Sequence, residues 1–205
     1  MTYTPCANLT NTEWLRLRQT GIGGSDVPAL VMPPDKWKWA RPADVLASKL
    51  GPIEELNALP CRIGHYMEPL VAKLFEEQTG LPVRNYNLMM RSDSHPFMIA
   101  NIDRKLIGRK TGLEIKTGNP FGLKEQFDTD TQDYPYHYYF QIQHYLGVSG
   151  WDDWYLACLR GNNFFRVYHV ERDDDTIRYL TEKEQEFWTL KEKGITVEEM
   201  RKLWQ

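Results

Sequence analysis

Two apolar segments near the middle of the chain, residues 99–103 and 113–117, constrain the fold most, because each contains a charged side chain. Both have the composition of buried strands, and side chains on a strand point alternately to its two faces. In the second segment, Glu114 and Lys116 therefore share one face and their apolar neighbours share the other. If the strands pair, Asp103 and Glu114 supply the carboxylate oxygens that a hard cation such as Mg²⁺ prefers.

Two carboxylates beside a lysine form the layout of a metal-dependent phosphodiesterase, in which Lys116 would orient the attacking water or help to deprotonate it. The alternative for Glu-x-Lys alone is a solvated face that carries a salt bridge. The apolar residues around Asp103 and Glu114 favour the first interpretation, because buried charges persist only when they are paired or bound to metal.

Composition predicts a single domain. A chain of 205 residues with 41% hydrophobic and 13% aromatic residues can bury one substantial core. We expect one nuclease domain over residues 1–205, with a core at about residues 12–175 and C-terminal helices at about 173–205. An apolar run of about 18 residues and a signal peptide are both absent, so we expect a soluble, intracellular protein without membrane contact.

Cysteine content and charge exclude several kinds of site. Cys6, Cys61 and Cys158 are widely spaced, which argues against a disulfide framework, a zinc site or an iron–sulfur cluster. The net charge is −3 and the pI is about 6.0, which argues against binding nucleic acid by bulk electrostatics. It does not exclude a nuclease, because a local groove can be positive on an acidic protein.

A glycine-rich turn at residues 20–24 precedes Ser25 and Asp26, either of which can cap the following short helix. Glycines before a helix let the backbone approach a ligand, and free N–H groups there favour an anion. Ser25 is therefore a candidate phosphate contact. The alternative is a plain loop with a serine cap.

The remaining pattern alternates helices and strands. We expect helices at residues 11–18 (capped by Asn11 or Thr12), 42–49, 62–79, 136–146, 173–193 and 197–204. We expect strands at residues 83–91, 97–106 and 112–117 and a hairpin of residues 153–160 and 164–170. Residues 120–133 are polar and irregular. Trp37 and Trp39 would stack on bases or pack onto the domain, and Trp188 and Trp204 would contact a partner or the core.

This order of elements, with Asp103, Glu114 and Lys116 as Asp-(x10)-Glu-x-Lys, resembles the PD-(D/E)xK nuclease superfamily. The resemblance implies an α/β, restriction-endonuclease-like fold with a central mixed β-sheet flanked by helices. Further segments resemble the YqaJ-type viral recombinases, the lambda exonuclease family: residues 14–18 with 21–25, 64–69, 138–146 and 170–173. The resemblance spans about residues 12–175. Ile102 replaces the proline of the superfamily motif, which leaves the carboxylate of Asp103 in place.

The resemblance implies a role for each of five catalytic or metal-binding residues. Asp103 and Glu114 would hold two Mg²⁺ ions, with the carbonyl of Ile115 as a further ligand and Mn²⁺ as a substitute. Lys116 would position the attacking water. Glu68 would complete the shell of one ion, directly or through water.

The resemblance also implies a pocket for a 5′-phosphate, formed by Arg18, Ser25 and Asn101. Gln141 would contact the scissile region or the attacking water. The spacing of seven residues between Arg18 and Ser25 favours Arg18 over Arg16 for this contact. A grip on the terminal phosphate would place the next phosphodiester over the metal site.

The implied function is that of a phage-type alkaline exonuclease with two-metal Mg²⁺ catalysis. It would hydrolyse linear double-stranded DNA 5′→3′ and leave 3′ single-stranded overhangs for a phage single-strand annealing protein. The resemblance further implies a phage-encoded homotrimer in the cytoplasm of a bacterial host. Two alternatives stay open: a PD-(D/E)xK endonuclease, which needs no terminal phosphate pocket, and a catalytically inactive DNA-binding module, which would lack a metal ligand.

Overall fold

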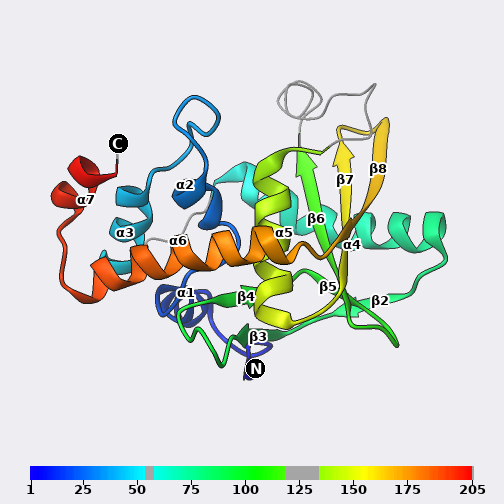
Figure 1. Cartoon of the computed structure of the whole chain (residues 1–205). Helices are drawn as coiled ribbons and strands as arrows, with labels where there is room; N and C mark the ends of the chain where they lie inside the picture. Colours follow the sequence, from blue (N-terminus) through cyan, green and yellow to red (C-terminus); the bar gives the residue numbers. More distant parts are fainter. Residues whose placement is uncertain (54–57, 119–133, 205) are drawn as a thin grey trace.

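The computed structural model describes residues 1–53, 58–118 and 134–204, and their strands form two sheets (Figure 1). The larger sheet has the order β2-β5-β6-β7-β8, and the smaller has the order β1-β3-β4. The larger sheet comprises β2 (Val83–Asn85), β5 (Arg104–Leu106), β6 (Thr111–Gly118), β7 (Asp153–Arg160) and β8 (Phe164–Glu171). The smaller comprises β1 (Thr2–Pro5), β3 (Leu88–Arg91) and β4 (Ile99–Asn101).

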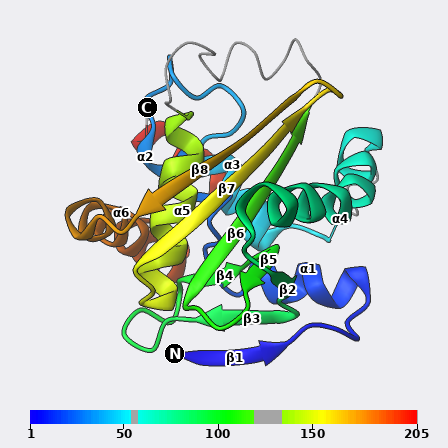
Figure 2. The same ribbon diagram turned by 90° about the vertical axis from the view of Figure 1, so that its right-hand side faces the viewer.

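The larger sheet is mixed, because β6 and β7 run parallel while its other neighbours run antiparallel. The helices are α1 (Asn11–Gln19), α2 (Val27–Val31), α3 (Pro42–Leu50), α4 (Leu59–Thr79), α5 (Tyr136–Ser149), α6 (Asp174–Glu192) and α7 (Val197–Leu203). Long β6 and β7 cross the middle of the molecule between α4 and α5 (Figure 2). The predicted α/β fold with a central mixed sheet flanked by helices is confirmed.

The two faces of β6 and β7 bury different sets of side chains, as their alternation requires. Leu113 and Ile115 pack with Val71 and Phe75 of α4 in one apolar cluster. Trp154 and Leu156 of β7 pack with α5 on the opposite face in a larger cluster. Glu114 and Lys116 consequently lie on the α5 side of the sheet, where a charged site has to be built into apolar surroundings.

Two predicted strands are each broken in the structure. Residues 83–91 divide into β2 and β3, and residues 97–106 divide into β4 and β5. The reason is that the halves have different partners: β2 pairs with β5 in one sheet, and β3 pairs with β4 and with β1, a strand that the sequence did not indicate. Asp103 therefore lies at the corner between the sheets rather than within a strand.

Several helix ends also differ from prediction. Thr10, rather than Asn11 or Thr12, caps α1 in a capping box with Glu13. The fifth helix continues past Gly147 to Ser149, and Gly150 ends it with φ 63°. Gly147 is instead a packing position, since a Cβ there would lie 3.0 Å from the side chain of Ile177.

Of the tryptophans with two possible roles, most pack against the core. Trp37, Trp188 and Trp204 are partly buried against the larger apolar cluster, whereas Trp39 is 76% exposed. The three cysteines are free thiols, of which Cys61 is exposed and Cys158 is buried. Within the described residues, no helix is both long and apolar enough to cross a membrane. The segment predicted as irregular, residues 120–133, lies outside the described residues.

The close approach of β6 and β7 can be tested at Gly112, over which the Trp154 indole lies. A Cβ at Gly112 would be 2.2 Å from Trp154 Cζ2, and Trp154 is fully buried. We therefore expect Gly112→Ala to lower the free energy of unfolding by about 1–3 kcal/mol in urea denaturation. Gly64→Ala, within α4, is the control and should be neutral or slightly stabilising, because a Cβ there would lie at an ordinary contact distance of 3.6 Å from Thr117 Oγ1. Equal stability of all three proteins would contradict this packing.

Candidate active site

Asp103 and Glu114 are brought together by a side-chain to backbone contact. Asp103 Oδ2 accepts a hydrogen bond from the Ile115 N–H at 2.8 Å. This bond joins the corner between the sheets to β6. Burial raises the pKa of Asp103 well above its usual range, and the adjacent Glu114 charge raises it further. The structure thus holds two carboxylates in one partly desolvated space.

Glu114 has one satisfied oxygen and one unsatisfied oxygen. Its Oε1 accepts hydrogen bonds from Lys116 Nζ at 2.5 Å and from Gln141 Nε2 at 2.7 Å. Its Oε2 is buried and has no hydrogen-bond partner among the described residues. Because a buried unpaired carboxylate oxygen is costly, a hard cation at Oε2 would remove an energetic penalty. The donor chemistry of Asp103 and Glu114 therefore fits Mg²⁺.

Glu68 reaches this region from α4, but it is already paired. Its carboxylate forms an ion pair with the guanidinium of Arg104, and His65 Nδ1 lies 4.0 Å from the other oxygen. No three His, Cys, Asp or Glu side chains of the described chain converge as a metal-binding group. A direct metal contact by Glu68 would require the Arg104 pair to rearrange, which favours contact through water.

Lys116 remains a cation in this arrangement. Burial alone would lower the pKa of Lys116, but the charges of Glu114 and Asp103 outweigh it and raise this pKa above its usual value. The ammonium also lies 5.1 Å from the centroid of the Tyr138 ring. A protonated lysine donates hydrogen bonds and cannot accept a proton. The positive charge of Lys116 therefore favours a role in orienting the attacking water over a role in deprotonating it.

Arg18 and Ser25 are in direct contact, as their proposed common role requires. Arg18 Nη2 donates to Ser25 Oγ at 2.7 Å, and its guanidinium carbon lies 5.1 Å from the centroid of the Trp14 ring. The Arg18 side chain keeps 31% of its surface exposed, and Asp26 Oδ1 is 3.9 Å away. Trp14 and Asp26 orient the guanidinium, which leaves donors available to an anion.

One cavity of about 440 Å³ contains most of the predicted site. Its lining includes six of the residues singled out in the sequence: Arg18, Ser25, Glu68, Asn101, Asp103 and Gln141. Glu114 and Lys116 lie behind Gln141, which bonds to Glu114 directly. Residues from four separate regions of the chain thus meet at one place.

The glycine-rich turn has a different role from the one expected. A Cβ at Gly24 would lie 2.6 Å from the Tyr145 ring and 2.9 Å from Gln141, so this glycine lets the turn pack on α5. The Gly23 N–H donates to Asp26 Oδ2 at 2.9 Å and is not available to an anion. Neither Ser25 nor Asp26 caps α2 through its side chain, since Ser25 accepts from Arg18.

Tyr145 and Lys49 are site residues to which the sequence analysis assigned no role. Tyr145 lines the cavity, and its hydroxyl accepts a hydrogen bond from Gln141 Nε2 at 2.8 Å. The i, i+4 spacing from Gln141 to Tyr145 is the signal that could have identified it. Lys49 Nζ lies 2.7 Å from Asp26 Oδ2 and balances the carboxylate beside Arg18. No local pattern near Lys49 pointed to this pair.

The sequence profile of the YqaJ-like viral recombinase domain matches residues 13–152. The chain belongs to this family. The uncharacterized protein YqaJ of Bacillus subtilis (strain 168) is 37% identical over 192 residues, which cover 92% of this chain and 58% of YqaJ. The chain therefore spans less than three fifths of that relative. The match confirms the resemblance to YqaJ-type proteins that the sequence motifs indicated.

Solved structures show the same fold at low sequence identity. The alkaline exonuclease LHK-Exo of Laribacter hongkongensis is 18% identical, with a TM-score of 0.72 over 93% of this chain and 96% of that chain. A phage-related exonuclease of Haemophilus somnus 129PT is 14% identical, with a TM-score of 0.62 over 88% and 99% of the two chains. The family thus shares its architecture with exonucleases.

Neutralising Asp103 and neutralising Asp26 should change the free energy of unfolding in opposite directions. The folded-state pKa of Asp103 is raised, so its ionised form costs stability at neutral pH, and this cost disappears as pH falls through that pKa. We expect Asp103→Asn to raise the free energy of unfolding by about 1 kcal/mol or more in EDTA at neutral pH.

Asp26→Asn is the matched control for this measurement. Although burial raises the pKa of Asp26, the charges of Lys49 and Arg18 outweigh it and lower this pKa, so the charged form stabilises the fold. Its removal leaves the buried Lys49 unpaired and should cost about 3 kcal/mol in urea denaturation. Destabilisation by both substitutions would show that Asp103 has a structural role and would contradict the assignment.

Proposed function

We propose that this chain is a Mg²⁺-dependent exonuclease that hydrolyses linear double-stranded DNA 5′→3′ and leaves 3′ single-stranded tails. The observation that carries the proposal is the single cavity shared by Arg18, Ser25 and Asp103, with Gln141 connecting it to Glu114. An enzyme that works from a phosphorylated DNA end requires a cation that binds the terminal phosphate and, near it, a pair of carboxylates that can hold metal.

Asp103 and Glu114, with the carbonyl of Ile115, are the residues that would hold the ions. When bound, Mg²⁺ would stabilise the negative charge that develops on the attacking and leaving oxygens of the phosphodiester. Hydrogen bonds from Lys116 and Gln141 to Oε1 fix the orientation of the Glu114 carboxylate. Glu68, in its pair with Arg104, would act on the ion shell through water.

Lys116, Gln141 and Arg18 would position the other reactants. The Lys116 ammonium would donate a hydrogen bond to the attacking water and hold one of its lone pairs toward the phosphorus. Gln141 would hold the same region from α5. Arg18 would form charge-assisted hydrogen bonds to the terminal phosphate, with Ser25 and Asn101 beside it, and so fix which phosphodiester is hydrolysed.

The contacts favour this function over the two alternatives. An endonuclease has no use for an arginine prepared to bind a terminal phosphate, whereas Arg18 lines the cavity and is oriented by Trp14 and Ser25. An inactive DNA-binding module would tolerate loss of a metal ligand, whereas Asp103, Glu114 and Lys116 are all present. Lys116 contacts Glu114, and Asp103 contacts the backbone of Ile115. The homotrimer and the phage single-strand annealing partner follow from the family resemblance and stay predictions.

The assay compares three DNA substrates with Mg²⁺: a linear duplex with 5′-phosphates, the same duplex with 5′-hydroxyls, and a closed circle. We expect mononucleotide release from the phosphorylated linear duplex, and a loss of about 100-fold or more in Lys116→Ala, since positioned catalytic groups contribute on this scale. Arg201→Ala, on the distant α7, is the control for removal of a cation and should keep full activity.

Two results would contradict the proposal. Nicking of the closed circle at a rate comparable with the linear duplex would indicate the endonuclease. Binding of DNA without hydrolysis at any Mg²⁺ or Mn²⁺ concentration would indicate the inactive binding module.

A further inference from the structure

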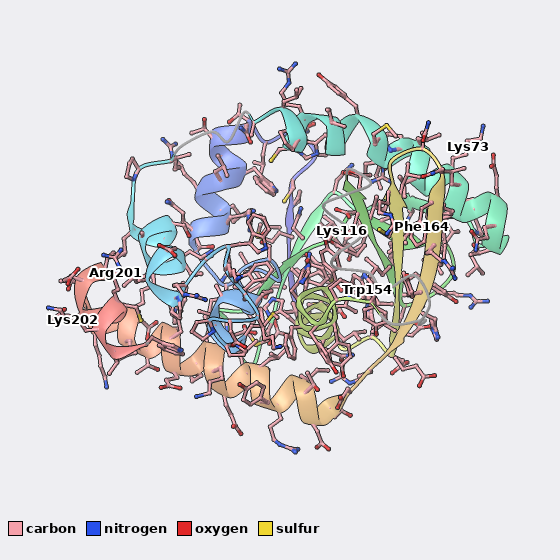
Figure 3. The ribbon with its side chains drawn as sticks, turned by 90° about the horizontal axis from the view of Figure 1, so that it is seen from above. Lys73, Lys116, Trp154, Phe164, Arg201 and Lys202 are labelled. Carbon is pink, nitrogen blue, oxygen red and sulfur yellow. The ribbon has the colours of Figure 1, made fainter. Side chains whose placement is uncertain are left out.

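Two arginines and a phenylalanine lie at the turn between β7 and β8, on the same face of the sheet as Lys116. Residues paired in register share a face of the sheet, so Lys116, Cys158 and Arg166 form one row across β6, β7 and β8. Arg160 and Phe164 form the next row. Lys116 and Phe164 lie at the same end of the sheet (Figure 3). We call Arg160 and Arg166 the β7–β8 arginine pair.

Both arginines of this pair are held against one aromatic ring. The guanidinium carbon of Arg160 lies 4.1 Å from the centroid of Phe164, and that of Arg166 lies 5.5 Å from it. The Gly161 N–H donates to the Gly118 carbonyl at 2.9 Å, which fixes the hairpin next to the end of β6. The two cations are therefore presented together on a rigid element.

Arg160 is the more informative of the two, because it is only 9% exposed and its Nη1 has no hydrogen-bond partner among the described residues. No carboxylate of the described residues lies within ion-pair distance of Arg160 or Arg166. Burying a guanidinium without an anion costs desolvation free energy, and a cation–π contact with one ring offsets only part of that cost. The site is electrostatically incomplete and suited to an anion.

The arginine pair lies on the opposite side of Glu114 from Arg18. Along α5, Gln141 and Tyr145 line the cavity that contains Arg18. Tyr138, on the preceding turn, instead contacts Lys116. Arg166 is two strand spacings, about 10 Å, from Lys116 across the sheet. Cys158, between Lys116 and Arg166, is fully buried, so a strand held by Arg18 at the carboxylates would reach the arginine pair along this end of the sheet and not across the row.

We propose that Arg160 and Arg166 form a second phosphate site, which binds the backbone of the nucleic acid strand beyond the scissile phosphodiester. A planar guanidinium pairs with a phosphate through two parallel hydrogen bonds, and Phe164 limits both guanidiniums to few orientations. The proposal rests on the proposed function, since it assigns the path of the strand on which that site would act.

The salt dependence of oligonucleotide binding measures how many phosphates the protein contacts. The probe is a fluorescent single-stranded oligonucleotide with a 5′-phosphate, bound to the full chain with Ca²⁺ replacing Mg²⁺ to prevent hydrolysis. Each phosphate contact contributes about 0.7 to the slope of log Kd against log salt concentration for single strands. We expect the slope to fall by about 0.7 in Arg166→Ala and by about 1.4 in the double variant Arg160→Met/Arg166→Ala.

Arg201→Ala is the matched control, because Arg201 is an arginine on α7 at the far end of the molecule from Phe164 (Figure 3). Its slope should equal that of the unaltered protein. An equal fall in Arg201→Ala would mean that only net charge is being measured and would overturn the site. Unchanged slopes in the Arg160 and Arg166 variants would also overturn it.

Thermal unfolding separates a binding role from a structural one. Methionine keeps most of the Arg160 packing and removes an unpaired charge, so the Tm of Arg160→Met should equal or exceed that of the unaltered protein. A fall of several degrees would show that Arg160 is a structural residue and would overturn its part in the site. Displacement of the oligonucleotide by inorganic phosphate at equal phosphate concentration would indicate a free-anion site and would overturn the backbone assignment.

The outcomes for the two proposals are separable. Absence of hydrolysis with Mg²⁺, together with the expected slopes, would contradict the proposed function and support the arginine site. Hydrolysis with unchanged slopes would support the function and overturn the arginine site.

Discussion

The arrangement depends on two carboxylates, Asp103 and Glu114, held close together against their mutual repulsion. The Ile115 N–H fixes Asp103, and Lys116 and Gln141 fix one oxygen of Glu114, while the other oxygen is buried and unpaired. The apolar clusters on both faces of β6 and β7 supply the packing energy that makes this charged strand tolerable. A divalent cation would complete the charge balance.

The helix α5 connects this carboxylate pair to Arg18 and Ser25, the proposed contacts of the terminal phosphate. Gln141 bonds to Glu114, while the same side chain and Tyr145 form the surface on which Gly24 packs. Arg18 reaches the neighbouring Ser25. The distance between grip and carboxylates is therefore set by backbone packing rather than by flexible side chains. That rigidity is what defined positioning of a phosphodiester requires.

Local patterns predicted the elements, and long-range pairing decided the details. Alternation identified β6, and the spacing of apolar residues identified α4, because both are long and uninterrupted. The breaks on either side of Asp103 were not predictable, since they arise from strands that join different sheets. Resemblance named Arg18, Ser25 and Gln141, which the fold brings together. Lys49 and Arg160 were assigned no role, because the role of each side chain depends on which charged groups lie near it in the folded structure.

The most direct test of the account is the ratio of hydrolysis rates on 5′-phosphorylated and 5′-hydroxylated linear duplexes, measured in the unaltered protein and in Arg18→Ala. If the cavity couples the phosphate grip to the carboxylates, the ratio should exceed about tenfold and should fall toward one when Arg18 is removed, because a charge-assisted pair contributes about 1.5–3 kcal/mol. An equal ratio in both proteins would contradict the account.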